Sequence, residues 1–157
     1  MDYGNMRFSL RTLFVVTTVL AVWLGHLAEQ AHRQRVVAKA IDRLHGQVRY
    51  DDSLSDSPLR RWLAGRLGRE RIASIEAVYL GGTRAGDDDL ALLKRLPRLR
   101  TVVLTSTRVT DVGLVHLRGL RTLETIDLRF TAVTEAGVAD LRRVLPQAKI
   151  LSKSDIE

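Results

Sequence analysis

The 157-residue chain contains no cysteine, so it can form neither a disulfide framework nor a thiolate metal site. This absence is compatible with any redox compartment. Aromatic residues make up only 5% of the chain, and they do not alternate with basic residues along any stretch. The net charge of +7 is spread as +1 over residues 1–28, +4 over 29–74 and +2 over 75–157. Because nucleic-acid binding normally needs a concentrated positive surface, we expect no nucleic-acid partner.

Groupings typical of catalysis are also missing. The chain has no glycine-rich phosphate loop, no nucleophile elbow and no constellation of paired carboxylates. Its histidines share no metal-ligand spacing with one another or with acidic residues. They are His26, His32, His45 and His116. We therefore expect no enzyme activity, no catalytic residue, no metal, no cofactor and no small-molecule substrate.

Residues 12–28 are 17 residues without a formal charge. As a helix they span about 25 Å, slightly less than the roughly 30 Å hydrocarbon core of a bilayer. We predict a single transmembrane anchor here, preceded by a basic flank over residues 1–11. A cleaved signal peptide is an alternative, although His26 or Glu29 would occupy its −3 position. A buried helix is the other alternative, although no other segment could enclose it.

The basic N-terminal flank favours a cytoplasmic N-terminus, with the rest of the chain on the non-cytoplasmic side. Basic residues that follow the apolar run favour the opposite orientation, and we expect export. After the anchor, residues 29–46 are expected to form a juxtamembrane helix. Residues 47–74 are expected to contain a short strand over 47–50 and a capping helix that starts at Ser57 and buries Trp62.

Three segments that follow one another at a spacing of 24 residues are nearly the same. They read Ile75-Glu-Ala-Val-Tyr-Leu-Gly-Gly-Thr83, Leu99-Arg-Thr-Val-Val-Leu-Thr-Ser-Thr107 and Leu123-Glu-Thr-Ile-Asp-Leu-Arg-Phe-Thr131. Each is followed by a segment of helical character. A repeat of this length is typical of stacked strand–helix units, in which no unit can bury its apolar side alone. Asp87-Asp88-Asp89 begins one helical segment, where acidic residues complement the helix dipole.

The L-x-x-L-x-L pattern of these segments resembles the leucine-rich repeat family. Asparagine is common at the ninth position of that family; here it is threonine, whose hydroxyl can bond the backbone of the turn. The run Val109-Thr-Asp-Val-Gly-Leu114 is similar to a subclass found in many bacterial repeats and in F-box-type proteins. The whole layout is similar to short bacterial membrane-anchored proteins of this repeat type.

The resemblance implies an α/β fold. It would be a short leucine-rich repeat solenoid over residues 75–151, with three 24-residue strand–helix repeats and a parallel sheet on the concave face. An N-terminal helical cap, a single transmembrane helix and a polar tail over 152–157 complete the expected layout.

The concave face of such repeats is the usual binding surface. We predict that a partner would contact Tyr79, Arg100, Val103, Asp127 and Arg129. Tyrosine and arginine are over-represented among residues that dominate binding energy at interfaces. Arg100 would also lie between Glu76 and Glu124 on adjacent strands, an alternation of charge that favours a structural ladder.

Together these observations predict a membrane-anchored protein–protein interaction module that performs no catalysis. Its partner would be a protein of unknown identity, and the chain would contact the membrane through residues 12–28. The alternatives are a purely structural envelope protein, a relic of a longer repeat array, or a secreted soluble repeat protein after signal cleavage.

Overall fold

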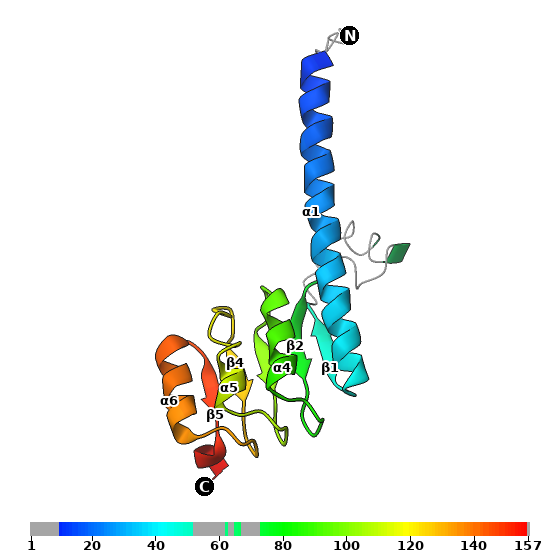
Figure 1. Ribbon diagram of the computed structural model, residues 1–157. Helices are drawn as coiled ribbons and strands as arrows, with labels where there is room; N and C mark the ends of the chain where they lie inside the picture. Colours follow the sequence, from blue (N-terminus) through cyan, green and yellow to red (C-terminus); the bar gives the residue numbers. More distant parts are fainter. Residues whose placement is uncertain (1–9, 52–61, 63–64, 67–72, 157) are drawn as a thin grey trace.

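The five strands found among the described residues form one mixed sheet, in the order in which they occur in the sequence (Figure 1). The computed structural model describes residues 10–51, 62, 65–66 and 73–156. The strands are β1 Gln47–Tyr50, β2 Ile75–Tyr79, β3 Thr101–Val103, β4 Thr125–Asp127 and β5 Lys149–Leu151. The helices are α1 Leu10–Arg43, α4 Asp87–Leu90, η2 Ala91–Arg95, α5 Asp111–Leu114, α6 Glu135–Val144 and η3 Lys153–Ile156.

Strands β2 to β5 are parallel, and their register advances by 24 residues from each strand to the next. Ala77 pairs with Thr101, Thr101 with Thr125, and Thr125 with Lys149. β1 joins the other side of β2 and runs antiparallel to it. Equivalent residues of each repeat therefore lie side by side, about 4.8 Å apart.

One face of the sheet is packed against the helices. The buried columns contain the first, fourth and sixth residues of each repeat, together with leucines of the helical segments. The strand members are Ile75, Val78, Leu80, Leu99, Val102, Leu104, Leu123, Ile126 and Leu128. Because side chains alternate along a strand, Tyr79, Val103 and their neighbours face the other way. We call this second surface the open face.

Threonine at the ninth position of each repeat bonds the backbone of the turn, as expected. The hydroxyls of Thr83, Thr107 and Thr131 donate to the carbonyls of Leu80, Leu104 and Leu128 at 2.7, 2.7 and 2.6 Å. Each hydroxyl thus satisfies a carbonyl at the end of a strand, where the sheet ladder stops.

A carboxylate clamp joins each helical segment to the next. Oδ1 and Oδ2 of Asp87 accept hydrogen bonds from the amide and hydroxyl of Thr110 at 2.8 and 2.6 Å. Asp111 binds Thr134 in the same way, at 2.9 and 2.6 Å. Burial alone would raise the pKa of Asp87, but the hydrogen bonds from Thr110 and Gly113 outweigh it, and the pKa is lowered.

The N-terminal helix α1 is a single continuous helix whose first half projects away from the sheet (Figure 1). Its C-terminal part packs on the first repeat, where Val37 and Ile41 are buried. Gly46 lies so close to the backbone of β2 that a Cβ added there would be 2.9 Å from the Tyr79 carbonyl oxygen. Between residues 13 and 23 the large apolar side chains are 52–74% exposed. These are Leu13, Phe14, Val15, Val16, Val19, Leu20, Val22 and Trp23.

Of the helices described, none combines the length and the apolar character needed to cross a bilayer. The predicted transmembrane anchor over residues 12–28 is therefore wrong, and so is the predicted single-pass localisation with the repeats on the non-cytoplasmic side. The apolar run is short for a bilayer core, and α1 continues without a break into a charged segment that begins at Glu29. Residues 29–43 of the predicted juxtamembrane helix over 29–46 are accordingly the C-terminal part of α1, which ends at Arg43.

The prediction of a solenoid with a parallel sheet is also wrong. The protein is α/β, as expected, but its sheet is mixed and has two strands beyond the three repeats. The helical segments are unequal as well, from four residues in α5 to ten in α6. Most of the predicted capping helix lies outside the described residues. Trp62, expected in its core, is 61% exposed, and the first repeat is instead covered by α1 and β1.

We expect Gly137→Ala to destabilise the protein, because an alanine Cβ would lie 2.2 Å from Oδ1 of Asp111 and would displace the clamp. Loss of its hydrogen bonds should lower the free energy of unfolding by about 1–2 kcal/mol. Urea unfolding followed by circular dichroism measures this change. Gly119→Ala is the matched control, since nothing lies within 4 Å of its Cβ. Alanine also favours the helix interior over glycine by about 1 kcal/mol at position 137, so a Gly137→Ala variant that is more stable than Gly119→Ala by that amount would show that the clamp contributes nothing.

Candidate functional site

The open face carries two rows of side chains that run across the strands. One row contains Tyr79, Val103, Asp127 and Leu151, which are paired in register. The other contains Arg49, Ala77, Thr101, Thr125 and Lys149. Tyr79, Val103 and Leu151 are half-buried. The first row is thus a partly apolar strip. The second row has a cation at each end, Arg49 and Lys149.

Asp127 and Arg129 form a rigid pair on this face. The Nε and a terminal nitrogen of Arg129 donate to the two carboxylate oxygens of Asp127 at 3.0 and 2.7 Å. The backbone amide of Arg129 also donates to Oδ1 at 3.1 Å. The hydrogen bond from the Arg129 side chain is the main reason that the pKa of Asp127 is lowered, against the opposing effect of burial. Forked geometry of this kind holds both side chains in place.

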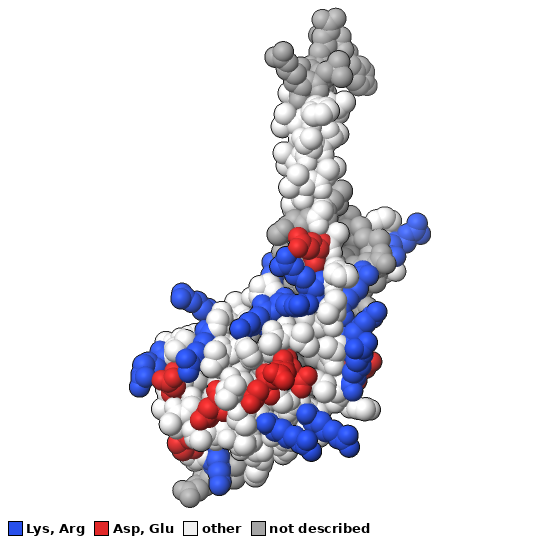
Figure 2. Space-filling view, in the orientation of Figure 1, with Lys and Arg blue, Asp and Glu red and all other residues white. Residues whose placement is uncertain are grey.

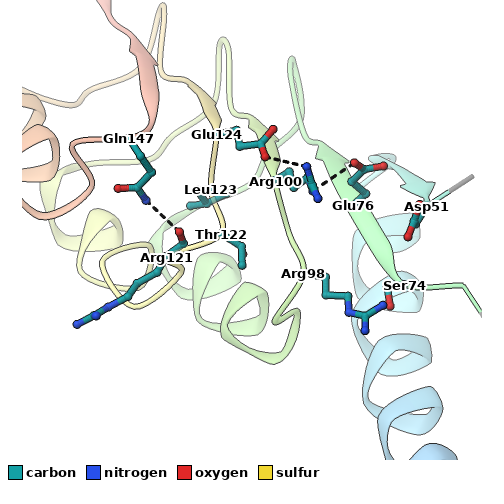
Figure 3. Close-up of a pocket in the computed structure, with 10 residues that line it drawn as sticks. All are labelled: Asp51, Ser74, Glu76, Arg98, Arg100, Arg121, Thr122, Leu123, Glu124 and Gln147. Carbon is teal, nitrogen blue, oxygen red and sulfur yellow. Dashed lines mark hydrogen bonds and ion pairs between the residues drawn. The ribbon is translucent and has the colours of Figure 1, made fainter. Parts of the chain in front are cut away.

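A hollow of about 410 Å³ lies at the edge where the parallel strands begin (Figure 3). At its centre the guanidinium of Arg100 lies between two carboxylates, 3.5 Å from Glu76 and 2.8 Å from Glu124. All three side chains come from equivalent positions of successive repeats. Exposed ion pairs of this kind contribute about 0–1 kcal/mol each, so the ladder orients Arg100 more than it stabilises the fold.

Two more arginines line the hollow but do not take part in the ladder. Arg98 extends along its wall on the side of Ser74, and the side chain of Arg121 points away from Arg100 (Figure 3). Neither forms a salt bridge with any residue that the structure describes. The carbonyl of Arg121 accepts a hydrogen bond from Gln147 at 3.0 Å, which ties the last repeat to the rim.

The five residues predicted to bind a partner fall into two groups. Tyr79, Val103 and Asp127 share one row, and Arg129 is bound to Asp127. Arg100 lies instead in the hollow at the edge where the strands begin. Asp127 is only 6% exposed, so it positions Arg129 and offers a partner little surface of its own.

Sequence reasoning missed one residue, Phe130, at the opposite edge of the sheet. Its φ angle is +58°, and its side chain is 62% exposed. A left-handed conformation is rare for a bulky residue and costs about 1–2 kcal/mol. The equivalent residues, Gly82 and Ser106, have φ angles of +71° and +58°. The signal in the sequence is the eighth position of the three repeats. It holds Gly82, Ser106 and Phe130, so the third repeat has an aromatic residue where the other two have small ones.

Within the described part of the chain, no three histidine or acidic residues are grouped so that they could hold a metal ion. Asp87 is engaged in the clamp, and Asp89 accepts a hydrogen bond from the amide of Gly86 at 2.8 Å. No protein-family model matches the chain, and no curated protein matches it. The resemblance to the leucine-rich repeat family therefore stays a prediction.

We expect Asp127→Asn to lower stability at neutral pH by about 1 kcal/mol, because the forked pair with Arg129 loses its charge. The folded pKa of Asp127 lies below the unfolded value, so its stabilisation is complete above about pH 4. It is lost as pH falls through the folded pKa. Urea unfolding at pH 7 and pH 2 should therefore show a smaller difference between wild type and variant at pH 2 than at pH 7. The same difference at both pH values would contradict this account.

Proposed function

We propose that the protein is a protein–protein interaction module that binds its partner through the open face. The row of Tyr79, Val103 and Asp127 is the observation that supports this proposal most directly. It places a half-buried aromatic and a half-buried aliphatic side chain side by side, next to a fixed arginine. Interfaces are commonly built around a few such anchors.

The ion pairs on the open face and in the hollow at its edge favour binding for an energetic reason. Arg129 is held by Asp127, and Arg100 is held between Glu76 and Glu124. Side chains that are already ordered lose little conformational entropy when a partner arrives. The guanidinium groups of Arg100 and Arg129 are hydrogen-bond donors held in fixed positions, with the partly apolar strip between them. This arrangement suits a protein partner, either a folded protein or an extended peptide. The absence of catalysis remains a prediction.

Site-specific photo-crosslinking in cells tests the proposal. A benzophenone amino acid replaces Tyr79 on the open face in one variant of the full chain. In the control variant it replaces Val115, which directly follows α5 and is 49% exposed. We expect a discrete protein adduct from position 79 and none of the same mass from position 115. Adding Val103→Lys should reduce the adduct roughly tenfold, because it places a charge in the apolar strip.

The proposal fails if position 79 yields no adduct, or if both positions yield the same set. It also fails if Val103→Lys leaves the yield unchanged while circular dichroism shows that the variant is folded. Adducts from position 79 that disappear with Val103→Lys would locate the contact on the open face.

A further inference from the structure

The turns that follow β2, β3 and β4 form a ridge along the edge of the sheet where these strands end. Their backbones are hydrogen-bonded to one another. The amide of Gly82 donates to Thr105 at 2.8 Å, and the amide of Ser106 donates to Arg129 at 3.0 Å. We call residues 81–84, 105–108 and 129–130, together with Lys153 at the start of η3, the turn ridge.

Phe130 occupies a position on this ridge for which its side chain is poorly suited. The same left-handed conformation is adopted by Gly82 and Ser106, which are small. Phe130 is mostly exposed and is absent from the buried apolar cluster, so packing does not account for it. Strain of this kind is typical of functional sites, where the surrounding structure maintains it.

The charged side chains of the ridge are cationic. Arg84, Arg108 and Lys153 are exposed and form no salt bridge with any residue among those described. Arg129 is paired with the buried Asp127, and Asp155 faces it from η3. In Figure 2 cationic side chains project at the lower edge of the molecule, below a separate acidic band on the helical side. The ridge is therefore a short cationic strip with an exposed aromatic ring.

We infer that the turn ridge binds an acidic peptide segment of the protein partner, with an apolar side chain of that segment packed on Phe130. Successive aspartate or glutamate residues on one side of this apolar residue would pair with Arg108 and then Arg84, which lie in that order along the turns from Phe130 to the first repeat. The inference rests on the proposed function, because it adds the chemistry of the partner and a second contact beside the open face.

An acidic peptide fits the ridge better than a nucleic acid does. Single-stranded nucleic acids are bound by several stacked aromatic residues along a basic groove. The ridge offers one aromatic residue, and residues 75–157 carry a net charge of only +2. A purely apolar segment would leave the cations of the ridge without partners.

Selection from a random twelve-residue peptide display library against the immobilised full chain tests the inference. We expect enriched peptides to carry aspartate or glutamate within a few positions of a large apolar residue. The most enriched peptide, labelled with fluorescein, is then titrated with each variant by fluorescence anisotropy. Phe130→Gly should weaken binding at least tenfold and Phe130→Trp should retain it, whereas Arg108→Glu should weaken binding and reduce its salt dependence.

The thermal midpoint separates a binding role from a structural one. Phe130→Gly relieves the backbone strain, so its midpoint should equal or exceed that of the wild type while binding is lost. A lower midpoint would show that Phe130 serves the fold, and would overturn the inference. Failure to enrich any peptide, or enrichment of basic peptides, would also overturn it, as would tighter binding of an oligothymidine probe.

One outcome distinguishes this inference from the proposed function. Peptides that bind with equal affinity to wild type and Phe130→Gly, but lose affinity with Tyr79→Ser, would overturn the inference and leave the open face as the binding surface. The crosslinking at position 79 tests the proposed function without any contribution from Phe130.

Discussion

The structure depends on one constraint, the 24-residue register that places equivalent residues of successive repeats side by side. Because apolar residues recur at this interval, their side chains form continuous buried columns on the helical face of the sheet. The same register brings Asp87 to Thr110 and Asp111 to Thr134, so the helical segments are joined by hydrogen bonds as well as by packing. Gly113 and Gly137 keep free the space that each clamp carboxylate occupies.

The α/β class could be predicted from the sequence because three copies of one pattern reinforce each other. A single Ile75-to-Leu80 segment would be ambiguous, whereas three in phase specify strands and a common buried face. The mixed sheet could not be predicted in this way. β1 lies outside the repeat, and its antiparallel pairing with β2 depends on how α1 packs on the first repeat, through contacts at Val37 and Ile41. The apolar run of α1 predicts a membrane span wrongly, because the length of a run without charge does not state what surrounds a helix.

The candidate site was predictable only in part. Alternation along a strand identifies Tyr79 and Val103 as neighbours on the open face, and the repeat length identifies Glu76, Arg100 and Glu124 as a ladder. Alternation does not show that Asp127 is almost buried by its pair with Arg129. Nor does it identify Phe130, whose distinguishing property is a backbone angle. Patterns of apolar residues carry information on burial, whereas strain appears only in the folded backbone.

The register also explains how a strained aromatic residue can persist at the turn ridge. Neighbouring turns are joined by the hydrogen bonds from Gly82 to Thr105 and from Ser106 to Arg129. The hydroxyl of Thr131 fixes the same turn from the other side, at 2.6 Å from the Leu128 carbonyl. With so many bonds determining the backbone, the turn keeps its left-handed residue whatever side chain is present there. Glycine meets this requirement at little cost, whereas serine and phenylalanine both hold a Cβ in a left-handed conformation, and the bulky ring of Phe130 does so without being buried.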